Sequence, residues 1–208
     1  METARCLPMF PLGTVLVPFA HLPLHIFEPR YRALAHDCLA GDREFGVVLI
    51  ERGSEVGGGD VRFGVGTVAR IVQAVELPDG RWLLDSLGTE RFRVQRWLED
   101  DPYPLAEIEP LAEAPAGPEA EPLRAEVERL LRQVLALQVE LGFPAPAATL
   151  ELDGDPAVAA YQAAVLSPLG PMDTQRLLED PGPEARLRHL VDFLGGARDT
   201  LARRMAEG

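Results

Sequence analysis

The stretch "PLHIFEPRYRAL", residues 23–34, decides how this chain is interpreted. Its first half is apolar and strand-like. Its second half begins with Pro29, which suits the first position of a helix because the N–H at that position has no intrahelical partner. Tyr31, Leu34, Ala35 and Cys38 then recur at three- and four-residue spacing until Gly41. We therefore expect a strand that turns into a helix at Glu28.

A carboxylate and a guanidinium, Glu28 and Arg30, flank this proline. Such a pair is either a catalytic acid with its cationic partner or a structural ion pair at the turn between a strand and a helix. A carboxylate at a helix entrance interacts favourably with the free N–H groups and with the helix dipole. We therefore favour the structural interpretation of Glu28 and Arg30.

The charge of the chain excludes several classes of function. Its net charge is −13, and residues 1–111 carry 11 Arg against 17 Asp and Glu, so neither half is basic. Nucleic acid and anionic membrane are therefore unfavourable partners. All 20 basic residues are Arg. Without lysine, the chain has neither the lysine of a Walker A loop nor the amine of Schiff-base or Ser–Lys chemistry.

The start of the chain and its cysteines indicate a cytoplasmic protein. "METARC" does not have the layout of a secretory leader, and Cys6 and Cys38 are too few for a disulfide framework or a four-cysteine zinc site. Residues 7–27 contain no Asp, Glu or Arg, but their four prolines would interrupt a membrane-spanning helix repeatedly. We expect short buried strands there.

The composition divides the chain into two parts. Residues 1–111 read as short strands separated by turns, with Pro78–Asp79–Gly80 as a strong hairpin signal. A Pro- and Ala-rich linker follows at 112–122. Residues 119–208 read as helical, beginning with an apolar stripe from Leu123 to Leu141. The expected fold class is α+β, a β pseudo-barrel followed by a bundle of helices.

Several motifs could carry chemistry, but each has a simpler explanation. His21 and His25 have the spacing of a zinc pair, but Pro23 between them makes the segment extended, so we expect no metal site. Gly64–Val65–Gly66 lacks the third glycine of a dinucleotide fingerprint and is more typical of a strand bulge or bend. Gly57–Gly58–Gly59 fits a hairpin loop. We expect no cofactor.

Nucleophiles and phosphate-binding residues are also few. The only serines are Ser54, Ser86 and Ser167, and none lies in a nucleophile motif. Alternation in "ERFRVQRWL" places Arg91 and Arg93 on an outward face, opposite Phe92. These arginines could contact phosphate, although a solvated strand face is the simpler interpretation. We expect no catalytic residue.

The sequence resembles a known family. "LPMFPLGTVLVPFAHLPLHIFEPRYRAL" (7–34) is similar to the opening signature of the N-terminal, substrate-binding domain of Lon protease. Further similar segments follow in family order: "GVGTVARI" (64–71), "GTERFRV" (88–94), "YPLAEIEPL" (103–111), "MDTQRLLE" (172–179) and "EARLRHLVDFL" (184–194).

This resemblance implies a PUA-like pseudo-barrel followed by an α-helical domain, as a stand-alone recognition module without ATPase or peptidase machinery. The residues carried over as its structural signature are Glu28, Arg30, Tyr31, Gly64, Gly66, Gly88 and Arg91. The candidates for contact with polypeptide are Phe19, Leu22, Leu24 and Phe27, unless that apolar stretch is barrel core.

Three functions follow as hypotheses. The first is a non-enzymatic module that binds unfolded polypeptide or a partner protein, as an adaptor or regulator of proteolysis. The second is RNA binding, which other PUA-like barrels perform and which would need a continuous positive face. The third is a small-molecule hydrolase or ligand sensor, which would need a pocket with converging titratable groups. The oligomeric state is left open.

Overall fold

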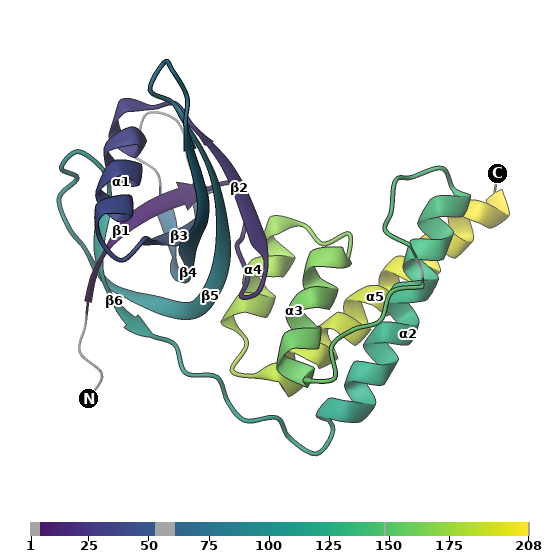
Figure 1. Cartoon of the computed structure of the whole chain (residues 1–208). Coiled ribbons are helices and arrows are strands. Elements are labelled where there is room, and N and C mark those ends of the chain that lie inside the picture. The colour runs from purple at the N-terminus through teal and green to yellow at the C-terminus, as the bar shows by residue number, and fades with distance from the viewer. Residues whose placement is uncertain (1–4, 53–60, 148, 208) are drawn as a thin grey trace. The chain divides into compact units, whose positions relative to one another are not determined.

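The computed structural model describes residues 5–52, 61–147 and 149–207. It confirms the α+β class. The chain divides into two compact units, Met1–Ala112 and Glu113–Gly208. The first unit contains all six described strands and one helix, and the second contains four helices (Figure 1).

The first unit is a closed, twisted sheet. Its strands are β1 (Arg5–Leu12), β2 (His21–Ile26), β3 (Glu44–Arg52), β4 (Val61–Glu76), β5 (Trp82–Trp97) and β6 (Leu105–Pro110). Their order is β2-β5-β4-β3-β1-β6, and β6 also pairs with the second half of β5, which closes the sheet. Among the described strands, β1 and β3 form the one parallel pair. Strand β2 pairs with the first half of β5 and lies outside the closed ring.

The turn between β4 and β5 is the hairpin that the sequence predicted. Leu77 and Arg81 close it with a backbone hydrogen bond of 2.8 Å. Gly80 has φ = 78°, a left-handed conformation that glycine adopts without steric cost. The register then keeps β4 and β5 paired from Glu76 and Trp82 onward.

Helix α1 (Pro29–Ala40) begins at the predicted proline and ends before Gly41. Its four buried residues are those of the predicted stripe, Tyr31, Leu34, Ala35 and Cys38. They pack into the larger core of the barrel with Phe10, Leu12, Leu16, Leu22, Ile26, Phe45, Val47, Ala69, Ile71, Leu84 and Tyr103. A smaller core contains Leu7, Met9, Val48, Val68, Phe92, Ala106 and Ile108.

The signature glycines lie where strands bend or approach closely. Gly64 lies in β4 where the pairing with β3 shifts register. A Cβ on Gly66 would be 2.2 Å from the carbonyl oxygen of Val47, and one on Gly88 would be 2.3 Å from that of Val17. Larger side chains would force these backbones apart. Gly57–Gly58–Gly59 and Ser54 lie outside the described residues.

The expected outward position of Arg91 is wrong. Its side chain is buried in the barrel unit, and its Nη2 donates a hydrogen bond to the carbonyl oxygen of Ala112. The side-chain alternation holds from Arg91 to Arg93, because these residues pair in regular register with Thr67, Gly66 and Val65. Arg91 is buried nevertheless, and its bond to Ala112 shows that the chain after β6 lies against it. Arg93 remains exposed.

The second unit is built from α2 (Ala120–Glu140), α3 (Pro156–Leu166), α4 (Pro171–Glu179) and α5 (Pro183–Glu207). The long helices α2 and α5 lie side by side, and α3 packs against both (Figure 1). Their common core consists of Ala120, Val127, Leu130, Leu131, Val134, Leu135, Leu152, Ala159, Ala160, Ala163, Ala164, Leu177, Leu187, Leu190 and Leu194. No helix of the described chain is long and apolar enough to cross a bilayer.

The segment expected to be a loosely packed linker is attached at defined points. The carboxylate of Glu113 pairs with the guanidinium of Arg186 at 2.9 Å, and Arg186 is fully buried. The backbone N–H of Ala114 donates to the carbonyl oxygen of Pro181 at 2.8 Å. Residues 112–116 are nevertheless exposed, and the partners of Glu113 and Ala114 lie on or next to α5, far away in sequence.

Candidate functional site

A small, mainly apolar groove lies beside the stretch with which the sequence analysis began. It has a volume of about 110 Å³ and is lined by Phe10, Leu12, Leu24, His25, Ile26, Phe27, Glu28 and Tyr31. Strand β1 supplies the first two residues, β2 and the corner after it supply the next five, and α1 supplies Tyr31. The strand-to-helix turn therefore brings three elements together around one groove.

The groove has a rigid wall. The rings of Phe10 and Tyr31 stack with their centroids 4.0 Å apart, and Tyr31 is buried. The guanidinium of Arg30 lies 4.4 Å above the centre of the Tyr31 ring. Stacked rings and a cation over an aromatic face each restrict side-chain rotation. The wall is therefore held in place before any ligand arrives.

Glu28 and Arg30 form an ion pair at the rim of this groove. The Nε of Arg30 donates to Oε2 of Glu28 at 3.1 Å, and both side chains are less than one-fifth exposed. The Glu28 carboxylate makes no capping hydrogen bond to α1, so its partner is Arg30 rather than the helix N-terminus. The arrangement joins the strand end to the first turn of the helix.

The four candidate contact residues have different positions. Phe27 is 55% exposed beside the groove, and Leu24 is half-buried in its lining. Leu22 is buried in the barrel core. Phe19 is 52% exposed, but it precedes β2 whereas Phe27 follows it. A strand of six residues separates the two by roughly 20 Å. The groove therefore unites Leu24 with Phe27 and leaves out Phe19.

Exposed apolar residues continue from the groove across the outer face of the sheet. The pairing register places His25 of β2 opposite Leu83 of β5, and Leu83 opposite Val75 of β4. Leu83 and Val75 are each 45% exposed. The rings of His25 and Phe27 lie 6.3 Å apart, so this row reaches the groove. We call Phe27, His25, Leu83 and Val75 the apolar row.

Sequence reasoning missed half of this site. Phe10 and Leu12 were not considered because only the sheet topology brings β1 to the end of β2. Leu83 and Val75 lie near the Pro78–Asp79–Gly80 hairpin, and their positions across from one another could have indicated a shared face. His25 was considered only as a metal ligand. Within the described residues there is no group of three or more His, Cys, Asp or Glu side chains that could hold a metal ion.

Two possible nucleophiles of the barrel unit, Cys38 and Ser86, are poorly suited to catalysis. Burial raises the pKa of the Cys38 thiol to about 12, with a further contribution from the nearby carboxylate of Asp37. A thiol with so high a pKa is not ionised at neutral pH and is a weak nucleophile. The hydroxyl of Ser86 is buried in β5. In the helical unit, the Ser167 hydroxyl donates to the carbonyl oxygen of Ala163 at 2.6 Å.

The comparison with known proteins shows the family to which this fold belongs. The family model of the ATP-dependent protease La (LON) substrate-binding domain matches residues 6–195. The chain belongs to this family.

Relatives with curated descriptions are whole proteases. The chain is 30% identical over 208 residues to Lon protease 2 of Myxococcus xanthus, covering 96% of this chain and 24% of that protein. It is 31% identical over 205 residues to Lon protease 2 of Herpetosiphon aurantiacus, covering 94% and 24%. The chain therefore spans about a quarter of the length of these relatives.

Solved structures of the same domain are similar throughout. A Lon N-terminal domain protein from Xanthomonas campestris has a TM-score of 0.65 and 32% identity, over 90% of this chain and 98% of that one. The N-terminal domain of Mycobacterium avium complex Lon protease has a TM-score of 0.68, over 92% and 98%. Its identity is 22%, so this second likeness concerns the fold alone.

Proposed function

We propose that this chain binds unfolded or extended polypeptide through the groove and the apolar row, and that its residues perform no chemistry on the bound polypeptide. The observation that carries the proposal is the exposed side chain of Phe27, which stands beside a preformed apolar groove in a member of a substrate-binding family. An apolar surface next to a rigid aromatic wall suits an unfolded chain, which exposes the apolar side chains that a folded protein buries.

The role in the cell follows from this recognition. We propose that the domain selects polypeptides for proteolysis or regulates their delivery to a protease, in the cytoplasm. Free Cys6 and Cys38 agree with a reducing compartment. Both units are acidic, which favours clients that are apolar or basic over acidic ones.

The burial of Arg91 weakens the alternative hypothesis that the chain binds RNA. It depended on Arg91 and Arg93 as neighbours on one exposed face, but Arg91 is buried and bonded to Ala112. Arg93 and Arg96 are exposed on β5, but Arg96 is paired with Glu107, so they do not make the continuous positive surface that a phosphate backbone requires.

The test is a binding titration with a fluorescent unfolded polypeptide. We expect Phe27→Ser to weaken binding about tenfold, because truncating an aromatic anchor removes most of its apolar contact. Val139→Ser is the matched control, since Val139 is also more than half exposed but lies on α2 of the helical unit and does not line the groove. Equal affinities of the two variants would refute the groove as the binding site.

Salt separates the two kinds of partner. Apolar contact should survive an increase from about 50 to about 200 mM salt, because screening weakens charge pairs far more than apolar burial. Single-stranded RNA bound through several phosphates would lose affinity by orders of magnitude over the same range. Tight, salt-sensitive binding of RNA together with no binding of polypeptide would reverse the proposal.

A further inference from the structure

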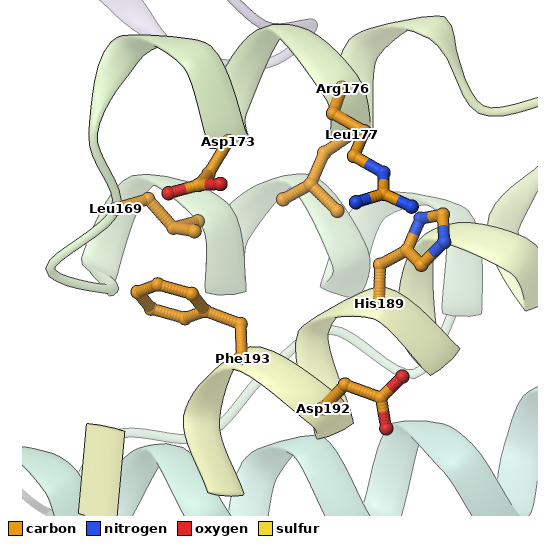
Figure 2. Close-up of a pocket in the computed structure, with 7 residues that line it drawn as sticks. All are labelled: Leu169, Asp173, Arg176, Leu177, His189, Asp192 and Phe193. Carbon is orange, nitrogen blue, oxygen red and sulfur yellow. The ribbon is translucent and has the colours of Figure 1, made fainter. Parts of the chain in front are cut away.

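The helical unit contains a second pocket that is separate from the groove. It has a volume of about 340 Å³ and lies between α4 and α5 (Figure 2). The α4 side supplies Leu169, Asp173, Arg176 and Leu177, and α5 supplies His189, Asp192 and Phe193. This volume is at the small end of ligand pockets and suits a group of about the size of one amino acid.

One end of this pocket is formed by apolar side chains, with the carboxylate of Asp173 beside Leu169 (Figure 2). Leu177 is buried, and Leu169 and Phe193 are half-buried. In Figure 2 the Phe193 ring and the Leu169 side chain lie at the same end, with Leu177 between them and the polar end. An apolar side chain placed here would cover surface that these three residues leave partly open to water.

The other end carries two nitrogen-bearing side chains. The Arg176 guanidinium and the His189 imidazole lie at this end, and the carboxylates of Asp173 and Asp192 are directed away from the guanidinium (Figure 2). Among the described residues, Arg176 has no ion-pair or hydrogen-bond partner. An unpaired arginine in a pocket of so acidic a chain is a binding group for an anion.

His189 is held in a fixed orientation. Its Nδ1 lies 2.9 Å from Oδ2 of Asp180, and Asp180 is buried. Because a carboxylate accepts, we assign the proton to Nδ1, which leaves Nε2 as the free nitrogen of the ring. The imidazole is therefore positioned by a buried partner and not by the ligand.

We propose that this pocket binds a carboxylate attached to an apolar residue, as at the C-terminus of a polypeptide that ends in an apolar side chain. Arg176 takes the carboxylate, and the apolar side chain packs on Phe193 and Leu169. Asp173, whose carboxylate lies near Leu169 in Figure 2, accepts the amide N–H of the terminal residue. The same chemistry is present in a free N-acylated apolar amino acid, so the test includes both sources.

The sequence contained a signal for this pocket that its motifs did not reveal. Asp173, Arg176 and Leu177 are spaced at i, i+3 and i+4, and His189, Asp192 and Phe193 repeat that spacing. Each set therefore lies on one face of its helix. Only the packing of α4 on α5 shows that the two faces meet.

The experiment compares short peptides with the full chain. Two fluorescent peptides have the same sequence and end in leucine, one with a free carboxylate and one amidated. We expect the carboxylate peptide to bind about tenfold more tightly, because a charge-assisted pair with arginine is lost on amidation. Arg176→Gln should abolish this ratio. Arg176 is exposed, so the variant should melt at the wild-type temperature, which a thermal scan verifies.

Arg93→Gln is the matched control, because it removes an exposed arginine of the other unit and should leave the tenfold ratio intact. Competition by N-acetylleucine would identify a small carboxylate as a ligand, and competition by peptides alone would identify the polypeptide terminus. Equal affinity for both peptides, or a ratio that persists in Arg176→Gln, would overturn the proposal. Phe27→Ser should leave the ratio unchanged, so this site and the groove can fail independently.

Discussion

Two arginines, one in each unit, are buried and make defined contacts within their own unit. Arg91 is buried in the barrel unit and bonds to the carbonyl oxygen of Ala112. Arg186 is buried in the helical unit, donates to the carbonyl oxygen of Leu177 at 3.0 Å, and stacks over the Tyr161 ring at 4.0 Å. Arginine suits such positions because its planar group can bond at the edges and stack on its face. Neither burial was predictable from a local pattern.

Glu28 remains predicted to be structural. Glu28→Gln should lower the free energy of unfolding by about 1 kcal/mol, because the partly buried guanidinium of Arg30 loses its charged partner. Thermal melting measures the effect. Glu109→Gln is the control, as Glu109 is exposed on β6. A Glu28→Gln protein that melts like the wild type but no longer binds polypeptide would instead assign this carboxylate to recognition.

Tyr103 gives a pH-dependent prediction. Its hydroxyl donates to Oδ2 of Asp37 at 2.8 Å, and this hydrogen bond, with the neighbouring His36, lowers the pKa of the Asp37 carboxyl. A lowered pKa in the folded state stabilises the protein above the unfolded pKa of about 3.9, and the stabilisation disappears as the pH falls through the folded pKa. Tyr103→Phe should therefore cost about 1 kcal/mol at pH 7.

The cost of Tyr103→Phe should be smaller at about pH 3 than at pH 7, because the stabilisation is lost as the pH falls from the unfolded pKa of about 3.9 through the lowered folded pKa. Chemical denaturation of wild type and variant at the two pH values gives the difference. A cost that is the same at both would show that the phenol acts through packing in the core and not through Asp37.

Secondary-structure elements show where local patterns were sufficient. The α1 stripe and the β4–β5 hairpin were predicted from the sequence because the determining residues lie within a few positions of each other. The groove was only half predicted. Leu24 and Phe27 belong to one apolar segment, whereas Phe10 and Leu12 reach it through pairing that no local pattern encodes. The expected exposure of Arg91 was wrong because Ala112, which is distant in sequence, lies against its side chain, and the two-residue period of a strand does not encode such a contact.

Gly195 and Gly196 of helix α5 give a prediction about stability. These residues lie inside a 25-residue helix, and a Cβ added to either would meet nothing within 4 Å. Replacing each by alanine should stabilise the helical unit by about 0.5–1 kcal/mol, because alanine loses less conformational entropy in a helix. Thermal melting should show a rise for both variants. Gly66→Ala is a control with the opposite expected sign. It should destabilise the barrel unit, since the added Cβ would lie 2.2 Å from the Val47 carbonyl oxygen.

A lower melting temperature for both helix variants would mean that α5 needs a flexible point at these two glycines. In that case, Gly195→Ala and Gly196→Ala should also change the binding of polypeptide or of the carboxylate peptide. Unchanged binding with raised stability is the expected result.

On the scale of the whole molecule, the sequence position at which the two units divide is more sharply defined than the composition suggests. The Pro- and Ala-rich segment looked like a free linker from 112 to 122. In the structure Ala112 bonds to Arg91 of the barrel unit, and the next residue, Glu113, pairs with Arg186 of the helical unit. Composition could indicate that a boundary exists. It could not reveal these attachments, since both arginines are distant in sequence.

Limited proteolysis tests this attachment. A protease that cleaves after glutamate should cut the folded wild type slowly at Glu113, because the carboxylate is paired with Arg186 and the next N–H is bonded to Pro181. Arg186→Met should keep most of the buried volume but free Glu113, at a cost of about 1.5–3 kcal/mol for the lost charge-assisted hydrogen bonds, since Glu113 is about one-third exposed. We expect cleavage at Glu113 to be at least about tenfold faster in this variant. A tenfold change in rate corresponds to about 1.4 kcal/mol, which is less than the expected loss of stability.

Arg188→Met is the control, because Arg188 pairs with Glu119 and Glu184 but is half exposed. It should leave the rate at Glu113 unchanged. Local release in Arg186→Met yields two stable fragments that meet at Glu113, whereas unfolding of the helical unit would give early cuts at Glu128 or Glu140, inside α2. If the wild-type protein is cut at Glu113 as fast as Arg186→Met, the ion pair does not protect the boundary. The segment would then act as the free linker that its composition suggests.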